Sequence, residues 1–370
     1  MLEFSDETFF FFCLPPIVFA SGFNMHRGDF FGNFSVIMIF GVVGTFVAFF
    51  SFSAMTITLK NWLPLKQYQY DEETEKFNYV DLRITDTECL LFCSLMCSSD
   101  VVAAVSIVSY ADQPKLFSIV FGEGITNDAV SIILFNAVLK FTTSGAELTA
   151  GSPLTIMADF TTLAFKSLFI GVIFALLSAW VLKRFRMFSK NPVMESMMIF
   201  CFGYISYVAS EGTENSGIIT LLTAGVLMAH YTWYNLSPQG KQSSFIVFQF
   251  LGYATEAFVF AYLGLTLFSY SKFEWSPQLF GLELLVIMVG RLGGTLGLVY
   301  LLKCCGYDAG MDLKEIIFVW YAGMIRGAIA FGLVLRINGQ KFENKRVIVT
   351  TSLCLVIFTT VVFGSTVALL

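Results

Sequence analysis

The chain has 370 residues, of which 56% are hydrophobic and only 13% are charged, and its formal net charge at pH 7 is −5. A soluble domain carries about 25% charged residues, so this composition excludes a water-soluble protein and predicts a surface that mostly faces lipid. Nothing in the charge balance indicates a nucleic-acid partner.

Long apolar stretches follow one another along the sequence and predict an all-α polytopic membrane protein. A helix needs about 20 apolar residues to cross a bilayer, and on that measure we expect about eleven spans. We expect residues 1–370 to form a single transmembrane domain that is the membrane core of a longer protein, since apolar stretches begin near Met1 and reach the last residue. The polar connections 61–86 and 142–159 are too short to form a soluble domain. The expected spans are residues 9–23, 34–59, 89–110, 116–141, 160–182, 193–210, 218–233, 246–269, 279–302, 316–337 and 347–370.

Three of these spans contain residues that interrupt a helix. Pro15 and Pro16 interrupt the first, the sequence Ser-Ser-Asp at residues 98–100 lies in the third, and glycines 323, 327 and 332 surround Arg326 in the tenth. Broken helices in two halves of a sequence indicate a transport site, because unwound backbone offers carbonyl groups and helix ends to an ion.

The third span also carries Cys89, Cys93 and Cys97, which recur at every fourth position and therefore lie on one helix face. Neither a His nor a carboxylate joins them at the spacing of a metal site. We therefore interpret them as small packing residues, and we expect no cofactor.

Basic residues predict the orientation of the spans in the membrane. The short connection 183–190 holds four Lys or Arg residues, whereas the connections 142–159 and 211–216 hold none. An excess of Lys and Arg marks the cytoplasmic side. Counting outward, we expect the C-terminus in the cytoplasm and the start of the first span on the opposite side.

Eight ionisable residues lie inside the apolar stretches, where each charge costs at least about 2.5–3.5 kcal/mol. A chain that carries several of them has to pair them, hydrate them or use them, and such residues mark ion and proton pathways by default. The sequence therefore predicts a secondary transporter rather than an enzyme. The eight are Asp100, Glu123, Asp128, Glu195, Glu256, Glu283, Arg291 and Arg326.

Asp128 lies well inside the fourth span and follows Asn127 in the sequence FGEGITNDAV. A carboxylate in an apolar surrounding favours its neutral form, so it can hold either a proton or a small cation but not both well. The amide oxygen of Asn127 can help to bind the cation, because hard cations prefer oxygen ligands. The competing interpretation is a protonated Asp128 that only makes a hydrogen bond between helices.

Asp100 has two interpretations, which can both hold. It can form a second oxygen cluster with the preceding serines, facing Asp128, or it can cap the break in the third span. Arg326 can neutralise Asp100 or hold the carbonyl groups and helix ends of a crossing.

Glu123 and Arg291 are the natural buried salt pair, and we interpret this pair as structural. Glu256 either lines the pathway or caps a helix. Glu195 and Glu283 lie near the ends of their predicted spans, so we expect both side chains to reach the membrane interface.

Six segments occur in the order found in one known family. They resemble, over nearly the whole chain, the monovalent cation/proton antiporters of the sodium/proton exchanger family. The third span departs from the family in having Val101 where a Pro is frequent. The segments are FFFFCLPPIVFASGF, SSDVVAAVSIV, FGEGITNDAV, ATEAFVFAYLG, MVGRLGG and AGMIRGAIAFGLVL.

This resemblance implies an antiporter fold of two inverted repeats with two crossing discontinuous helices, which are the spans that hold Asp100 and Arg326. It implies a core transport domain, with elements at about residues 86–140 and 245–337, together with a dimerisation domain and a homodimer. It also implies that helices precede the first span and that a cytoplasmic tail follows the last.

The resemblance further assigns roles to single residues. Asp128 would carry the monovalent cation and the proton, with Asn127 and Asp100 beside it. Glu123, Arg291, Arg326 and Glu256 would form a structural charge network, with a Glu123–Arg291 pair as in members that have an Asn-Asp site. The inhibitor-associated segment would contain Phe11, Phe12, Leu14, Pro15 and Pro16.

The expected function is electroneutral exchange of Na⁺, or K⁺, for H⁺ by alternating access. One carboxylate that carries one charge either way gives one-for-one exchange and no net current. Two alternatives are a cation channel, which would pass current without proton coupling, and an intramembrane aspartyl protease that uses Asp100 and Asp128 as a dyad. The GEG sequence and the loop HYTWYNLSPQGK resemble the endosomal and vacuolar branches more than the plasma-membrane branch.

Overall fold

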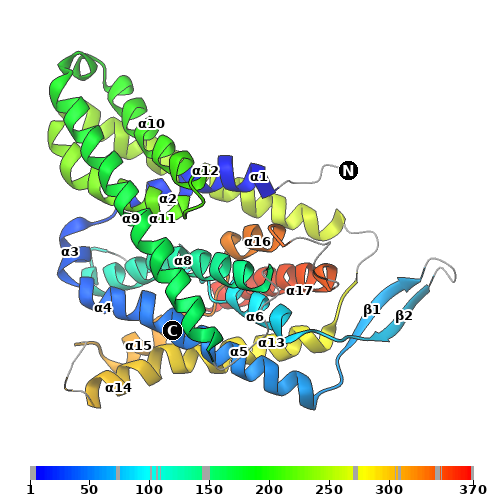
Figure 1. Cartoon of the computed structure of the whole chain (residues 1–370). Helices are drawn as coiled ribbons and strands as arrows, with labels where there is room; N and C mark the ends of the chain where they lie inside the picture. The colour runs from blue at the N-terminus through cyan, green and yellow to red at the C-terminus, as the bar shows by residue number, and fades with distance from the viewer. Residues whose placement is uncertain are drawn as a thin grey trace. The chain divides into compact units, whose positions relative to one another are not determined.

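The structure is a computed structural model that describes residues 6–71, 76–100, 102–105, 107–108, 110–143, 151–269, 274–304, 306, 310–337, 342 and 344–367. Within these residues nearly all regular structure is helical, and the one sheet is a two-stranded hairpin (Figure 1). The chain divides into two units. Unit 1 is Met1–Gly28 with Gly151–Phe260, and unit 2 is Asp29–Ala150 with Ala261–Leu370.

Unit 1 contains α1 (Asp6–Thr8), η1 (Phe9–Cys13), α2 (Leu14–Phe23), α9 (Ser152–Arg184), η3 (Arg186–Lys190), α10 (Pro192–Glu211), α11 (Gly217–Leu227), η4 (Met228–Thr232), η5 (Trp233–Asn235) and the larger part of α12 (Pro238–Ser269). Helix α11 packs against α2, α9 and α10. The helices approach closely because a glycine lies at a crossing: a Cβ on Gly171 would lie 2.6 Å from the carbonyl oxygen of Thr220. Aromatic packing joins α2 to α12, with the ring centroids of Phe19 and Phe248 5.0 Å apart.

Unit 2 begins with α3 (Arg27–Gly32), α4 (Phe34–Met38), η2 (Ile39–Gly44), α5 (Thr45–Trp62), β1 (Lys66–Asp71), β2 (Lys76–Asp81), α6 (Asp86–Leu95), α7 (Val102–Val105) and α8 (Pro114–Thr143). It continues with α13 (Pro277–Leu292), η6 (Gly293–Gly297), α14 (Leu298–Cys304), α15 (Leu313–Ala322), α16 (Ala328–Leu335), α17 (Lys345–Phe358), η7 (Thr359–Phe363) and α18 (Gly364–Thr366). Helix α5 packs against α6 and α13, while α16 contacts α6, α8 and α17 (Figure 1).

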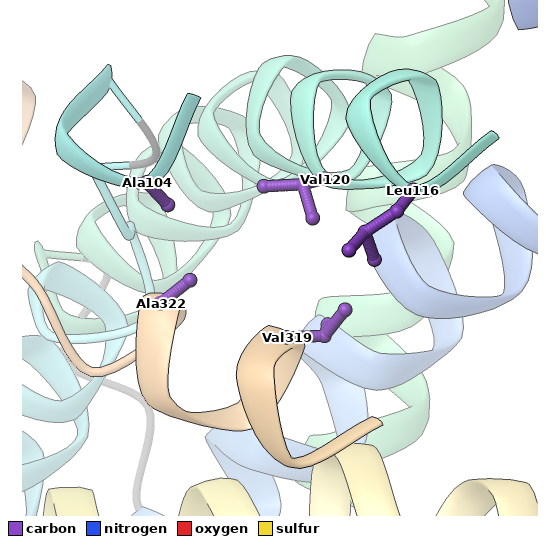
Figure 2. Close-up of a cluster of buried hydrophobic side chains, with 5 residues drawn as sticks. All are labelled: Ala104, Leu116, Val120, Val319 and Ala322. Carbon is purple, nitrogen blue, oxygen red and sulfur yellow. The ribbon is translucent and has the colours of Figure 1, made fainter. Parts of the chain in front are cut away.

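Helix α8 is the support on which both broken helices of unit 2 rest. Its residues Leu116 and Val120 form one buried cluster with Ala104 of α7 and with Val319 and Ala322 of α15 (Figure 2). Between helices within a bilayer, such side chains stabilise the contact by close van der Waals packing. The cluster therefore fixes the second half of one broken helix and the first half of the other against α8.

Seven helices among the described residues are long and apolar enough to cross a membrane. They fall on the predicted spans 34–59, 116–141, 160–182, 193–210, 246–269, 279–302 and 347–370. Four further predicted spans fall on shorter elements: 9–23 on η1 and α2, 218–233 on α11 to η5, 89–110 on α6 and α7, and 316–337 on α15 and α16. The total of about eleven spans stays a prediction.

The polar connection 61–86 forms an antiparallel hairpin that its composition did not lead us to expect. Tyr68 of β1 lies opposite Tyr79 of β2. The other edge of β1 contacts Trp275: the Tyr68 amide donates to the Trp275 carbonyl at 2.7 Å, and the Trp275 amide donates back at 3.2 Å. The hairpin is thereby tied to the start of α13, since Ser276 also donates from Oγ to the Lys66 carbonyl at 2.7 Å.

Candidate functional site

The break predicted in the third span is present after α6, and we refer to it as the first break. A capping box fixes the start of this helix: the Glu88 amide donates to Thr85 Oγ1 at 3.3 Å, and the Glu88 carboxylate accepts from the Thr85 amide at 2.9 Å. The helix ends at Leu95, and α7 does not begin until Val102. Residues 98–100 therefore lie outside both helices.

The second predicted break is present after α15. This helix also begins with a capping box, made by Asp312 and Glu315, and it ends at Ala322. Helix α16 begins at residue 328, so residues 323–327 are not helical. Gly332, expected to contribute to the interruption, lies inside α16 and does not break it.

The two breaks satisfy each other's polar groups. The amide of Asp100 donates to the carbonyl oxygen of Ile325 at 2.8 Å. The guanidinium of Arg326 donates from Nη1 to the carbonyl oxygen of Ser98 at 2.7 Å. A Cβ on Gly327 would lie 2.8 Å from the Cβ of Asp100, so only a glycine lets the two backbones come this close. Arg326 thus has the second of its expected roles, holding an unwound carbonyl group.

Asp128 lies on α8 next to the first break. Its Oδ1 accepts a hydrogen bond from Ser98 Oγ at 2.8 Å, and its side chain is half-buried. A carboxylate beside hydroxyl and carbonyl oxygens is the donor set that a hard monovalent cation prefers, and the same carboxylate can take a proton. Among the residues that the structure describes, no group of three or more His, Cys, Asp or Glu could hold a metal ion.

Asn127 is fully buried and links α8 to three other parts of unit 2. With its amide oxygen toward Arg291, that oxygen accepts from Arg291 Nη2 at 2.9 Å and from Ser99 Oγ at 2.5 Å. Its nitrogen then donates to the Cys97 carbonyl at 3.1 Å and to Thr45 Oγ1 at 2.8 Å. This orientation is the consistent one, because the Thr45 hydroxyl gives its own proton to a carbonyl of η2 and can only accept from the amide.

Glu123 and Arg291 form the ion pair that the sequence predicts. Arg291 Nη2 lies 3.2 Å from Glu123 Oε1, and both side chains are buried. Arg291 also donates from Nε to the Gly323 carbonyl at 3.0 Å, at the start of the second break. A Cβ on Gly323 would lie 2.9 Å from Nε and from Nη2 of this arginine. One guanidinium therefore joins α8, α13 and the second break.

Arg326 is the second buried cation of the site and is fully enclosed. Its guanidinium lies 5.6 Å from the ring centroid of Phe52 on α5, which is a cation–π distance. Its backbone is fixed by η7: the Arg326 amide donates to Thr359 Oγ1 at 3.2 Å, and Thr360 Oγ1 donates to the Arg326 carbonyl at 2.8 Å. Nε and Nη2 have no hydrogen-bond partner within the described residues.

The remaining predicted site residues lie in unit 1. Glu256 is half-buried on α12. In the aromatic segment, Phe11 and Phe12 of η1 are 36% and 72% exposed, whereas Leu14 is buried. Pro15 and Pro16 do not break the first span as expected, because they lie in the first turn of α2, where proline is tolerated, and η1 continues into α2 without a gap.

Two expectations about carboxylates are wrong. Glu195 and Glu283 do not reach an interface: they are 0% and 1% exposed. Glu195 accepts from Ser237 Oγ at 2.7 Å at the start of α12, and Glu283 accepts from Thr56 Oγ1 at 3.0 Å. The partners lie far away in the sequence, so position within a span could not reveal the burial.

The sequence analysis also missed hydroxyl residues that position the site. They are Thr45, Thr359 and Thr360, each bonded to a site residue or to its backbone. The pair Thr359-Thr360 inside an apolar span was an available signal. Threonine hydroxyls often bond to their own helix, however, so this signal alone would not have been specific.

Comparisons with known proteins show what the whole chain is similar to. The sequence matches the family described as "Sodium/hydrogen exchanger, transmembrane" over residues 4–370. Sodium/hydrogen exchanger 3 of Arabidopsis thaliana is 31% identical over 379 residues, which cover 98% of this chain and 71% of that protein. Sodium/hydrogen exchanger 8 of Homo sapiens is 33% identical over 365 residues, which cover 98% of this chain and 59% of that protein.

Solved structures show the same fold. The sodium proton antiporter MjNhaP1 from Methanocaldococcus jannaschii superposes with a TM-score of 0.68 at 13% sequence identity, covering 96% of this chain and 80% of that one. At this identity the likeness concerns the fold alone. It confirms the predicted all-α antiporter fold, while the division into core and dimerisation domains stays a prediction.

Proposed function

Because the chain belongs to the sodium/hydrogen exchanger family, we propose that it is a sodium/proton antiporter of the membrane in which Asp128 binds either the cation or the proton. Membership of a transporter family favours this reading over the cation channel and the aspartyl protease. It also agrees with a protein that is not an enzyme, and no cofactor is part of the proposal.

The observation that carries the proposal is the position of Asp128. Its carboxylate lies at the first of two mutually bonded helix breaks and accepts a hydrogen bond from Ser98 at 2.8 Å. Breaks of this kind expose carbonyl groups and helix ends inside the protein, where an ion can lose its water to protein oxygens. We propose that Asp128 supplies the charge and that Asp100 and the Ser98 hydroxyl complete the set of oxygen groups. Asn127 lies beside them, and its amide oxygen reaches the cation only by giving up a hydrogen bond from Arg291 or Ser99.

The proposed exchange is electroneutral. Glu123 and Arg291 cancel each other as a buried ion pair, with Nη2 and Oε1 3.2 Å apart. The charge of Arg326 is fixed at the breaks, next to the Ser98 carbonyl. Asp128 then carries one negative charge that is balanced by one proton or by one monovalent cation, so a full cycle moves no net charge.

We propose alternating access as the means of transport, with the core elements at about residues 86–140 and 245–337 moving past a dimerisation domain. We propose Na⁺ as the cation with K⁺ as a second substrate, a homodimer, and an endosomal or vacuolar membrane with the plasma membrane as the alternative. The four basic residues of the connection 183–190 support a cytoplasmic C-terminus. The aromatic segment around Phe11 and Phe12 is proposed as the inhibitor-associated segment.

The test is reconstitution into liposomes that contain a pH dye, with the membrane potential clamped and Na⁺ or K⁺ added outside. The parent chain should show a cation-driven pH change, and Asp128→Asn should abolish it while leaving the fold intact. Asp112→Asn is the matched control, since this aspartate is exposed on the connection before α8. Transport that survives in Asp128→Asn would rule out the carrier role of Asp128, and current without a pH change would favour a channel.

A further inference from the structure

Glu283 on α13 is a buried carboxylate that forms no ion pair with any residue the structure describes. It accepts a hydrogen bond from Thr56 of α5, whose Oγ1 lies 3.0 Å from Oε1. Its Oε2 is buried and has no hydrogen-bond partner within the described residues. The other buried carboxylates of the described chain have a charged partner or further hydrogen bonds. Glu123 pairs with Arg291, although its Oε2 also has no partner, while Glu195 accepts from Ser237 and Glu88 accepts from Thr85 and Asn344.

Neither charge state of Glu283 is fully satisfied by its surroundings. The ionised form has one hydrogen bond and no counter-charge, and a buried charge is costly without a partner. The neutral form carries an O–H group that finds no acceptor among the described residues, and an unmade buried hydrogen bond also costs free energy. A carboxyl in this position can gain or lose a proton without breaking an ion pair, whereas Glu123 is held by Arg291.

The groups around Glu283 form a line that runs toward the end of the helix pair α5–α6. Cys93 of α6 donates from Sγ to Thr56 Oγ1 at 3.6 Å, and Thr56 donates on to Glu283. Cys89 lies one turn away from Cys93 on the same face of α6 and is buried. Lys60, one turn beyond Thr56, pairs with Asp86 at 2.5 Å, and these side chains are 10% and 53% exposed.

We propose that Glu283 is a second proton-binding carboxyl of this protein, separate from the Asp128 cluster and reached from the Lys60–Asp86 end of α5 and α6. The cysteines of α6 then have a part in the site, since the Cys93 thiol donates to the hydroxyl of Thr56 that holds the carboxyl. A proton gained or lost at Glu283 changes the charge at the contact of α5, α6 and α13.

The charged neighbours of Glu283 do not neutralise it. Lys60 is bonded to Asp86, and Arg346 of α17 is bonded to Glu274 at 3.1 Å. Arg291 of α13 itself is bonded to Glu123, Asn127 and Gly323. The titratable groups with described side chains on the elements around α13 are Lys60 of α5; Asp86, Glu88, Cys89, Cys93 of α6; Lys66, Tyr68 of β1; Lys314, Glu315, Tyr321 of α15; and Lys345, Arg346, Cys354 of α17.

The test measures the proton directly and does not depend on transport. Infrared difference spectra of the protonated-carboxyl band are recorded from about pH 5 to about pH 9, the range in which a buried glutamate titrates. The chain carries Asp128→Asn, with and without Glu283→Gln. We expect a band that disappears as the pH rises in the first protein and is missing from the second. Because Asp128 is absent from both, failure of the antiporter proposal would leave this result unchanged.

A second pair of variants tests the assigned hydrogen bond. Thr56→Val removes the donor to the ionised carboxylate, so the midpoint of the band should move up by about one pH unit. Thr56→Ser keeps the hydroxyl and should leave the midpoint in place. The proposal is overturned by a Glu283 band that stays constant over the whole pH range, by spectra that Glu283→Gln does not alter, or by a midpoint that Thr56→Val leaves unchanged.

Discussion

Replacing Arg291 by Met should destabilise the protein strongly, because the arginine joins three parts of unit 2. The guanidinium donates to Glu123 at 3.2 Å, to Asn127 at 2.9 Å and to the Gly323 carbonyl at 3.0 Å. Met keeps most of the buried stem and its flexibility, so the loss is mainly electrostatic. Removing one member of a buried ion pair costs about 3–5 kcal/mol, since the other charge is left without a partner.

The double variant Glu123→Gln/Arg291→Met separates this cost from simple loss of packing. With the carboxylate replaced by an amide, the remaining cost is that of unpaired neutral groups, about 1–3 kcal/mol. The double variant should therefore be more stable than Arg291→Met alone, although it carries one more substitution. Arg83→Met is the control, because this arginine is exposed in the connection before α6.

The assay is heating of the purified protein in detergent, followed by size-exclusion chromatography to measure the fraction that remains monodisperse. At about 2–4 °C per kcal/mol, as for domains of 150–250 residues, Arg291→Met should lower the midpoint by about 10 °C. The double variant should recover about half of that. A single variant as stable as the parent would refute the reasoning, and so would a double variant less stable than Arg291→Met.

Two further predictions follow from the site. Gly323→Ala should lower both the thermal midpoint and the transport rate, because the added Cβ would lie 2.9 Å from two nitrogens of Arg291. Gly281→Ala on α13 is the control and should leave both quantities unchanged, because its added Cβ would meet nothing within 4 Å. Ser98→Ala should raise the cation concentration for half-maximal transport by about two- to tenfold, the value of one hydrogen bond to Asp128. Heating in detergent measures the thermal midpoint, and liposome transport measures the rate and its cation dependence. An unchanged cation dependence in Ser98→Ala would exclude the hydroxyl from the site.

The sequence predicted the features that depend on local chemistry. Helix breaks occur at residues with low helix propensity. Ser-Ser-Asp at 98–100 and the glycines beside Arg326 therefore predicted where the two breaks lie. The Glu123–Arg291 pair could be predicted because a buried arginine needs a buried acid and few were available.

Features that depend on distant partners could not be predicted in the same way. Glu283 looked like an interface residue because it lies near the start of its span, whereas its partner Thr56 is 227 residues away. The same holds for Thr45, whose bond to Asn127 requires the packing of η2 on α8. The roles of Asp128, Asp100 and Glu256 stay predictions until transport is measured.

The bonds between the two breaks have a consequence for how the protein is made. The carbonyl of Ser98 accepts a hydrogen bond from Arg326, 228 residues later in the chain, and the amide of Asp100 donates to the carbonyl of Ile325. Backbone groups without partners are not stable within the hydrocarbon of a bilayer. While the chain is being synthesised, the segment 96–100 therefore has to remain hydrated, shielded or fully helical until α15 and α16 have been inserted. The first half of the candidate site can reach its final conformation only after residues 325 and 326 have been inserted.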